Sequence, residues 1–162
     1  MIYYYFGNKE RLFAEVLKTI YRRMNEAETA LKVDTDNPIA AITAVIHFTW
    51  QYYLDHPEFI TLLNTENLHK GKHLQEASRV DELLPPGVSI IGQILKDGEQ
   101  KGLFRAGVEP RDLYIAIAAL GYFYLSNRST LSAFLGENLM AKDSLKHWRD
   151  FMTQTVLRSI AP

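Results

Sequence analysis

The sequence predicts an all-α protein of about eight helices, and three observations lead to this class. Apolar residues recur at spacings of three and four, the period of a helix with one buried face. The alternation of apolar and polar residues that is typical of strands is almost absent. Prolines follow residues that favour helix boundaries, as at Asn37-Pro38 and His56-Pro57. Short loops between such helices favour a single all-α domain.

The first three helices are predicted between residue 8 and about His69. Asn8 suits an N-cap, and an amphipathic helix follows it over residues 8–32. A polar, acidic break precedes Pro38, which opens a second helix. That helix stops at His56, because the residue before a proline is disfavoured in helical geometry. Pro57 then opens the third helix.

The later helices are predicted from the same signals. A short amphipathic segment covers residues 74–84, and the Pro-Pro-Gly sequence at 85–87 forms a hinge. The next helix ends near Gly102. Pro110 starts a helix that continues or kinks on to Gly136, and the last helix covers residues 142–160.

Composition narrows the class of protein. The chain has 162 residues, 47% of them hydrophobic and 23% charged, which suits one globular domain. Cysteine is absent, which excludes disulfides, thiolate metal sites and a cysteine nucleophile. No apolar run approaches the roughly 20 residues of a membrane-spanning helix, and the N-terminus lacks signal-peptide character. A cytoplasmic protein without a membrane partner is therefore expected.

An enzyme is not expected. The sequence contains no nucleophile elbow, phosphate-binding loop, dinucleotide fingerprint or HExxH motif. The formal net charge of −1 also lacks the basic excess of a free-standing nucleic-acid binder.

The most informative segment is IYYYFGNKERLF at residues 2–13. It resembles the end of the helix-turn-helix of TetR-family repressors. The family pattern begins with an aliphatic residue and a run of aromatic residues. It continues with Phe-Gly, a small polar residue, Lys-Glu and, after one further residue, Leu-Phe. Tyrosine hydroxyls and a lysine in the first turn of the next helix can grip phosphates. The resemblance implies that Tyr3, Tyr4, Tyr5 and Lys9 contact DNA in the full-length protein.

The resemblance also implies a division of the chain. Residues 1–7 would be the remnant of the recognition helix, 8–32 a connecting helix, and 33–162 an effector-binding and dimerisation domain. The first two helices of the family would precede Ile2, so this sequence is expected to be a sensor and dimer body that does not bind an operator alone. The missing head would be the basic part, which reconciles the net charge with a DNA-binding family.

The expected function is that of a ligand-responsive transcriptional regulator, and specifically a repressor. By resemblance it binds operator DNA as a homodimer, needs no cofactor, and is released by a small-molecule effector of unknown identity. The alternative is a helical interaction or scaffold domain without an effector pocket. A partly apolar cavity between the helices would favour the first hypothesis.

The candidate effector pocket combines aromatic and polar side chains from several predicted helices. An aromatic-rich wall would suit a planar or hydrophobic effector, and polar residues could orient it. Trp50 and His47 could equally be a core residue and a satisfied histidine, and the polar residues could form a solvated face. The candidates are His47, Trp50, Tyr53, Phe59, Leu63, Glu66, Asn67, Tyr122 and Phe123.

The sequence does not predict a metal site, although one segment has suitable residue types. Glu66, His69 and His73 have spacings that can converge on one helix face. Gly71 weakens a helix between the two histidines, and the segment is polar.

The two late helices resemble the pair that forms the dimer interface in the family. Aromatic residues and methionine are enriched on their stripes, and Gly121 would permit close approach. Packing within one chain is the alternative. The candidates are Tyr114, Ile117, Gly121, Tyr124, Leu125, Leu145, Trp148, Met152 and Thr155.

Overall fold

A computed structural model describes residues 8–34, 36–76 and 85–162 of the chain. Within these residues all regular secondary structure is helical, which confirms the predicted all-α class. The helices are α2 (Lys9–Ala30), α3 (Pro38–Asp55), α4 (Pro57–Leu68), α5 (Lys72–Glu76), α6 (Pro86–Gln100), α7 (Pro110–Ser126), α8 (Arg128–Leu135) and α9 (Lys142–Ile160).

The first helices begin where their capping residues predict. The Asn8 side chain accepts a hydrogen bond from the Arg11 backbone N–H at 2.9 Å and so caps α2. Asn37 caps α3 in the same way, with the N–H of Ala40 at 3.1 Å. Pro57 ends α3 and occupies the first turn of α4, as predicted.

The later boundaries differ in part from the prediction. The predicted hinge at 85–87 is wrong, because Pro85 is the N-cap of α6 and Pro86 and Gly87 are its first residues. Of the predicted segment 74–84, the structure describes only the start, within α5, and residues 77–84 lie outside the described residues. The predicted helix from Pro110 to Gly136 is interrupted at Asn127, which separates α7 from α8. Gly136 ends α8 in the left-handed region, with φ 67°.

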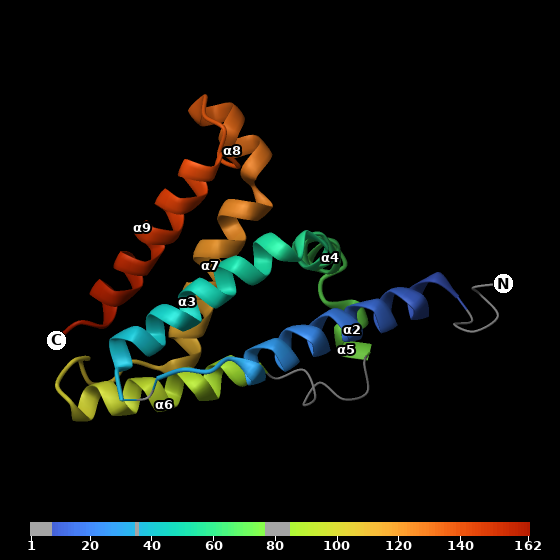
Figure 1. Ribbon diagram of the computed structural model, residues 1–162. Coiled ribbons are helices and arrows are strands. Elements are labelled where there is room, and N and C mark those ends of the chain that lie inside the picture. The colour runs from blue at the N-terminus through green and yellow to red at the C-terminus, as the bar shows by residue number, and fades with distance from the viewer. Residues whose placement is uncertain (1–7, 35, 77–84) are drawn as a thin grey trace.

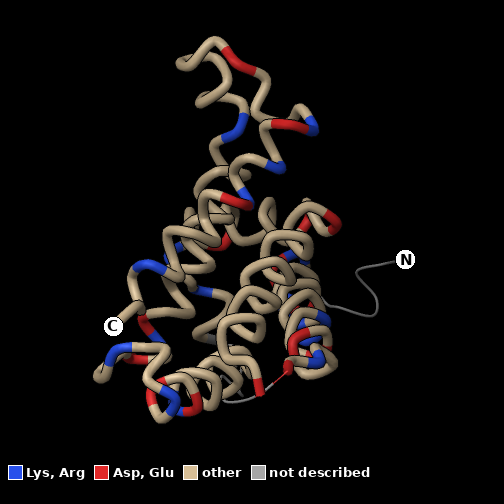
Figure 2. The backbone as a smooth tube through the Cα atoms, turned by 60° about the vertical axis from the view of Figure 1, so that its left-hand side comes forward, with Lys and Arg blue, Asp and Glu red and all other residues tan. Residues whose placement is uncertain are grey.

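Helix α3 lies at the centre of the fold and contacts α4, α6, α7 and α9 (Figure 1). Helix α2 runs along one side of the body and packs on α5 and α6. Helices α7, α8 and α9 form an arm that rises from the body, with α7 and α9 joined through α8 at its tip (Figure 1). Positions of lysine, arginine, aspartate and glutamate are scattered along the helices and separated by long uncharged stretches (Figure 2).

The core is continuous from α2 to α9. Its largest fully buried side chains come from α2, α3, α6, α7 and α9. They are Leu17, Ile42, Ile46, Ile91, Ile94, Ile117, Met152 and Ile160. Among the described helices, none has the length and apolar character that crossing a membrane requires.

Candidate functional site

An aromatic interior forms where α2, α3, α4 and α7 meet, and Tyr53 is at its centre. The Tyr53 ring stacks on Phe59 with centroids 5.7 Å apart and planes at 16°. Tyr21 of α2 meets Phe59 edge-on, also at 5.7 Å. Gly121 of α7 lies against Tyr53, because a Cβ at that position would be 3.2 Å from the tyrosine ring. The small residue therefore lets α7 approach α3 closely.

A polar network crosses from α4 to α7 beside this interior. The Tyr122 hydroxyl donates a hydrogen bond to the side-chain oxygen of Asn64. The Ser126 hydroxyl donates to the same oxygen at 3.1 Å. Asn67 donates from its amide to the Tyr122 hydroxyl at 3.5 Å. Two of the predicted pocket residues, Asn67 and Tyr122, thus come together with Asn64 and Ser126.

Glu28 is a buried carboxylate that joins three helices. It is 3% exposed, near the end of α2. The backbone N–H of Gly87, in the first turn of α6, donates to it at 2.8 Å. The Tyr114 hydroxyl of α7 donates to its other oxygen at 3.1 Å. Burial raises the pKa of Glu28, against the opposing effect of these two hydrogen bonds.

Several tyrosine hydroxyls share this environment. Burial raises the pKa of Tyr53 and of Tyr114, and the nearby charge of Glu28 raises both further. Burial also raises the pKa of Tyr21, with smaller contributions from Glu66 and Tyr122. No lysine, arginine or histidine is among the groups that shift these three pKa values. The interior is therefore aromatic and rich in hydroxyl groups, with Glu28 as its buried carboxyl group.

The other predicted pocket residues lie in different places. His47 lies on the α9 side of α3, where burial and the charge of Arg149 lower its pKa. Phe123 is 58% exposed on the outside of α7. Trp50 is a core residue, edge-on to Tyr124 with ring centroids 5.6 Å apart. Leu63 packs half-buried against the core.

The Glu66 carboxylate is bound by residues of α5. One carboxylate oxygen pairs with the His73 ring nitrogen Nδ1 at 2.7 Å, and both side chains are almost fully buried. Its other oxygen accepts from the backbone N–H groups of His73 and Leu74, at 2.8 and 3.1 Å. The His73 ring meets Phe13 of α2 edge-on at 4.9 Å. Glu66 therefore links α4 to α5 and, through His73, to the first half of α2.

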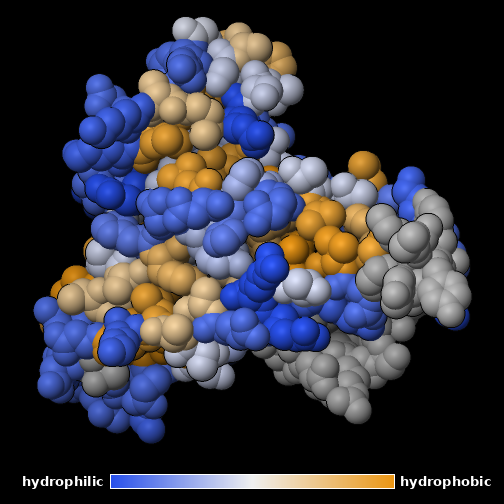
Figure 3. Space-filling model, turned by 45° about the vertical axis from the view of Figure 1, so that its right-hand side comes forward, coloured by the Kyte–Doolittle hydropathy of each residue, from blue (hydrophilic) through white to orange (hydrophobic). Residues whose placement is uncertain are grey.

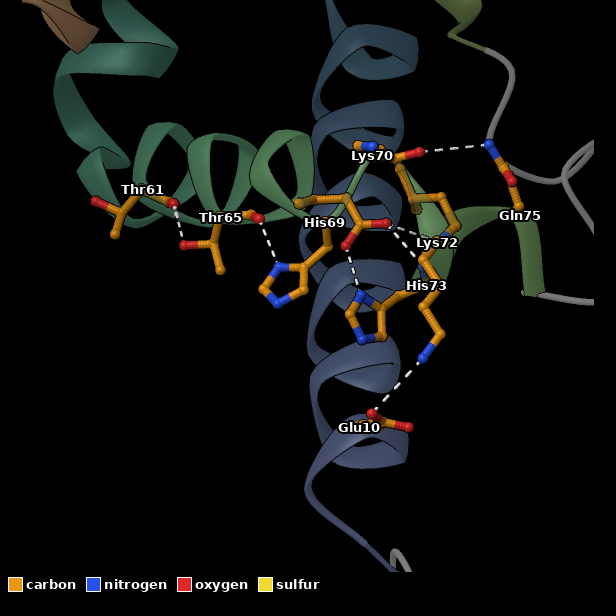
Figure 4. A network of polar contacts seen from close by, with 10 residues as sticks. Glu10, Thr61, Thr65, His69, Lys70, Lys72, His73 and Gln75 are labelled. Carbon is orange, nitrogen blue, oxygen red and sulfur yellow. Dashed lines mark hydrogen bonds and ion pairs between the residues drawn. The ribbon is translucent and has the colours of Figure 1, made fainter.

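The histidines weighed as metal ligands have protein partners. His73 is bonded to Glu66, and His69 Nδ1 lies 2.8 Å from the backbone carbonyl of Thr65 (Figure 4). In the part of the chain that the structure describes, no three histidine or acidic side chains gather with the geometry of a metal site.

The predicted dimer residues fall mostly on the inner faces of α7 and α9. Ile117, Gly121, Tyr124, Leu125 and Met152 are buried in the chain's own core. Tyr114 is bonded to Glu28. Leu145 is half-buried, and Trp148 is half-buried with its indole N–H donating to the Leu120 carbonyl at 3.2 Å. Thr155 is the one exposed residue of this predicted set.

The outer face of the same arm carries exposed apolar residues instead. Ile115, Phe123 and Phe151 are each about half exposed, at 56%, 58% and 48%. Nearer the tip, Phe134 of α8 is 85% exposed. A groove of about 520 Å³ opens between α7, α8 and α9, with Phe123, Leu131, Leu135 and Trp148 among its lining residues. Apolar side chains also reach the surface of the arm in the space-filling view (Figure 3).

The predicted DNA-contacting residues are only partly described. Tyr3, Tyr4 and Tyr5 lie outside the described residues. Lys9 is the first residue of α2 and is exposed, as a phosphate contact would require.

Two central residues of this interior were not predicted from the sequence. Glu28 lies on the buried stripe of α2 with Leu17 and Met24, at helical spacing. A charged residue in register with that stripe was the available signal. Tyr21 gave a weaker signal, because a tyrosine at the edge of an amphipathic stripe is common on ordinary helices.

Comparison with known proteins finds similar sequences. Residues 38–156 match the family described as "Tetracyclin repressor-like, C-terminal domain". The chain is 43% identical to the HTH-type transcriptional repressor NicS of Pseudomonas putida, over 99% of this chain and 76% of that protein. It is 28% identical to the HTH-type transcriptional repressor SCO4008 of Streptomyces coelicolor, over 74% of this chain and 57% of that protein.

Both relatives are named as transcriptional repressors and neither as an enzyme, in agreement with the motif analysis. The family match covers α3 to α8 and most of α9, and the 43% identity extends through α2 and the segment at residues 2–13. The chain therefore belongs to the TetR family of transcriptional regulators.

Proposed function

We propose that this chain is the sensor and dimerisation part of a TetR-type transcriptional repressor. The full-length protein binds operator DNA as a homodimer, and a small-molecule effector releases it. The effector binds in the interior around Tyr53, where α2, α3, α4 and α7 meet. The names of the two relatives support the repressor role.

The observation that carries the proposal is the double role of α2. Its first residue, Lys9, lies within the segment at residues 2–13 that resembles the end of the DNA-reading motif. Two of its later residues, Tyr21 and Glu28, contribute to the interior. A ligand that displaces either side chain acts on the helix that leads to the DNA-reading end. Binding can thereby favour one orientation of α2 over another, which is what release of an operator requires.

The Glu66 pair supplies a second link between the same parts. Helix α4 contributes Phe59 and Asn64 to the interior and Glu66 to the contact with α5. His73 of α5 packs on Phe13, within the second turn of α2. A shift of α4 is therefore transmitted to α2 through packed side chains.

The dimer is proposed to form through the outer face of α7 and α9. This face presents Ile115, Phe123 and Phe151, which a single chain leaves about half exposed. Exposed apolar residues on two neighbouring helices favour burial against a second copy. A two-fold axis beside the arm brings two copies of each helix together in a four-helix arrangement. The inner residues Ile117 and Met152 then hold the arm on its own core.

The test is an operator-binding assay with the full-length protein. Binding to DNA that flanks its own gene is measured by fluorescence anisotropy, in a titration with and without small aromatic molecules. The expected result is tight binding of two chains per site, and release by at least one compound that also binds this chain. Absence of DNA binding under all conditions would refute the repressor role. Binding that no compound affects would favour the scaffold alternative.

A further inference from the structure

The groove on the arm, between α7, α8 and α9, is a cavity that the proposed sensor function does not use. Its volume of about 520 Å³ lies within the range of pockets that hold a drug-sized molecule. All of its lining residues lie within residues 123–148, on the three helices of the arm and the loop before α9. The groove is therefore separate from the interior around Tyr53, and it lies where the three helices meet (Figure 1).

The floor of the groove is mostly apolar, and packing fixes its aromatic rings. Trp148 and Tyr124 stack with ring centroids 4.9 Å apart and planes at 24°. The indole N–H of Trp148 donates to the Leu120 carbonyl, and the Tyr124 hydroxyl donates to the Leu139 carbonyl at 2.8 Å. The polar groups of both rings are thus satisfied inside the chain. Such a floor favours an apolar or aromatic group, which it can bind without ordering flexible side chains.

Two carboxylates, those of Glu137 and Asp143, line the same groove and are exposed. Neither carboxylate has an ion-pair partner among the residues that the structure describes. Burial raises the pKa of Tyr124 in the floor, and the charge of Glu137 raises it further. A negative charge at the edge of the groove is therefore felt at its floor.

Basic residues nearby on the arm are paired elsewhere. No lysine or arginine lines the groove, and its third titratable residue is His147. Arg128 donates to a backbone carbonyl of α7 at 2.7 Å. Lys146 and Arg149 both pair with Asp150, at 3.3 and 3.0 Å. The groove thus combines an apolar floor with two carboxylates that lack a counter-charge.

We propose that this groove binds a small amphipathic cation, namely an aromatic molecule that carries an ammonium group. The aromatic ring packs on the floor against Trp148, and the ammonium group lies beside Glu137 and Asp143. An anionic molecule would meet two like charges, and a neutral one would leave both carboxylates unpaired. The proposal goes beyond the sensor function and does not depend on it.

A second copy of the chain is the other candidate occupant, because Phe123 belongs both to the groove and to the face proposed for the dimer. Apolar side chains of a second copy could cover the floor. They would bring apolar surface against the two carboxylates and supply no counter-charge, which opposes their burial. An ammonium group supplies that charge, and for this reason the proposal favours the cation.

The test compares 1-naphthylmethylamine, 1-naphthylmethanol and 1-naphthoate as probes on this chain, by ligand-observed NMR titration. The three probes share one ring system and have nearly the same size, but they are positive, neutral and negative at neutral pH. The expected order of affinity is the amine first, then the alcohol, with naphthoate weakest. Added salt is expected to weaken the amine and to have little effect on the alcohol, because salt screens exposed charges.

The double variant Glu137→Gln with Asp143→Asn removes both charges from the groove and keeps the size of the side chains. It is expected to weaken the amine by about threefold to tenfold, the range of two exposed ion pairs, and to leave the alcohol unchanged. Unaltered binding of the alcohol also shows that the variant keeps its fold.

The matched control is the double variant Glu99→Gln with Asp97→Asn. It removes the same two charges from α6, which contributes no residue to the groove. Its affinity for the amine should remain that of the wild type. An equal loss of affinity in both double variants would mean that the net charge of the chain, and not the groove, attracts the amine, and would overturn the proposal.

Three further outcomes would also overturn it. The first is equal affinity of the wild type for the amine and the alcohol, and the second is an unchanged amine affinity in the groove variant. The third is dissociation of a dimer by the amine in sedimentation, which would show that a second copy occupies the groove. None of these outcomes bears on operator binding or on the interior around Tyr53, so the proposed function is tested separately.

Discussion

At the scale of single residues, two buried glutamates have pKa values that are shifted in opposite directions. Hydrogen bonds hold the pKa of Glu66 below its ordinary value even though burial alone would raise it; they come from the His73 ring and from the backbone N–H groups of Leu74 and His73. Burial dominates at Glu28 and raises its pKa. Glu66 accepts three hydrogen bonds and also lies beside the charge of His73, whereas Glu28 accepts two hydrogen bonds and lies deeper among packed atoms.

Glu66→Gln is expected to lower the free energy of unfolding by about 2 kcal/mol at neutral pH, because hydrogen bonds to a charged acceptor are lost in a buried site. A lowered folded-state pKa stabilises the fold above the ordinary glutamate pKa, and this stability is lost as the pH falls through the folded value. The difference between wild type and variant should therefore shrink in acid. Urea unfolding at several pH values measures it.

Glu58→Gln is the control for that substitution. Glu58 also pairs with a histidine, His56 at 3.1 Å, but both side chains are about half exposed. An exposed ion pair contributes less than about 1 kcal/mol, so this variant should remain close to wild type. If the two variants lost equal free energies of unfolding, burial would not strengthen the pair between Glu66 and His73.

Glu28→Gln is expected to change the slope of stability with pH. Because its pKa is raised in the folded chain, the folded state holds the proton more tightly than the unfolded chain does. The free energy of unfolding of the wild type therefore falls, relative to the variant, as the pH rises from the ordinary glutamate pKa through the folded value. Urea unfolding from acid to neutral pH tests this. A wild-type advantage that grows toward neutrality would mean that the bonds from Gly87 and Tyr114 outweigh burial.

At the scale of elements, substitution of two glycines in α6 distinguishes the effect of close packing from that of helix propensity. A Cβ at Gly98 would overlap the ring of Phe104, a buried residue just beyond the end of the helix. A Cβ at Gly92 would meet Pro110 at 3.4 Å, an ordinary van der Waals contact. The first glycine is therefore required by the close approach of Phe104, and the second is not.

Gly98→Ala should lower the free energy of unfolding by about 2 kcal/mol, because the core must shift to admit a methyl group. Gly92→Ala should be neutral or stabilising by up to about 1 kcal/mol, because alanine is the better helix former. Thermal and urea unfolding of the two variants provide the comparison. If both variants lost a similar free energy of unfolding, the need for glycine would come from helix α6 as a whole and not from the contact with Phe104.

At the scale of the whole molecule, the exposed apolar face of the arm makes stability depend on association. A folded dimer that dissociates on unfolding has a melting temperature that rises with protein concentration. We expect this rise in the wild type. Phe151→Glu should abolish it and yield a monomer in sedimentation, since a charge replaces an apolar residue at the proposed two-fold interface.

Leu68→Glu serves as the control for the arm. Leu68 is 82% exposed at the end of α4, outside the arm. A glutamate at this position should leave the sedimentation, and the dependence of the melting temperature on protein concentration, as in the wild type. Loss of the dimer in Leu68→Glu together with its retention in Phe151→Glu would place the interface elsewhere.

The sequence alone determined the fold class, the family, and the starts of α2, α3, α4, α7 and α9. These depend on local signals, namely periodicity, capping residues such as Asn8 and Asn37, and prolines at helix starts, and the motif at residues 2–13 is contiguous. The interior around Tyr53 was only partly predictable. Aromatic character predicts Tyr53, Phe59 and Tyr122 as residues of this interior. The packing of α2 brings Glu28 and Tyr21 to them.

Tertiary structure alone decided which face of each helix is inside. On α7 and α9 the apolar residues cover more than one side, so periodicity could not separate the inner Ile117 and Met152 from the outer Phe123 and Phe151. It also decided that Glu66 pairs with His73 and that His47 faces α9. These outcomes depend on helices that are distant in the sequence, and a pattern within one helix carries no information about the partner that covers it.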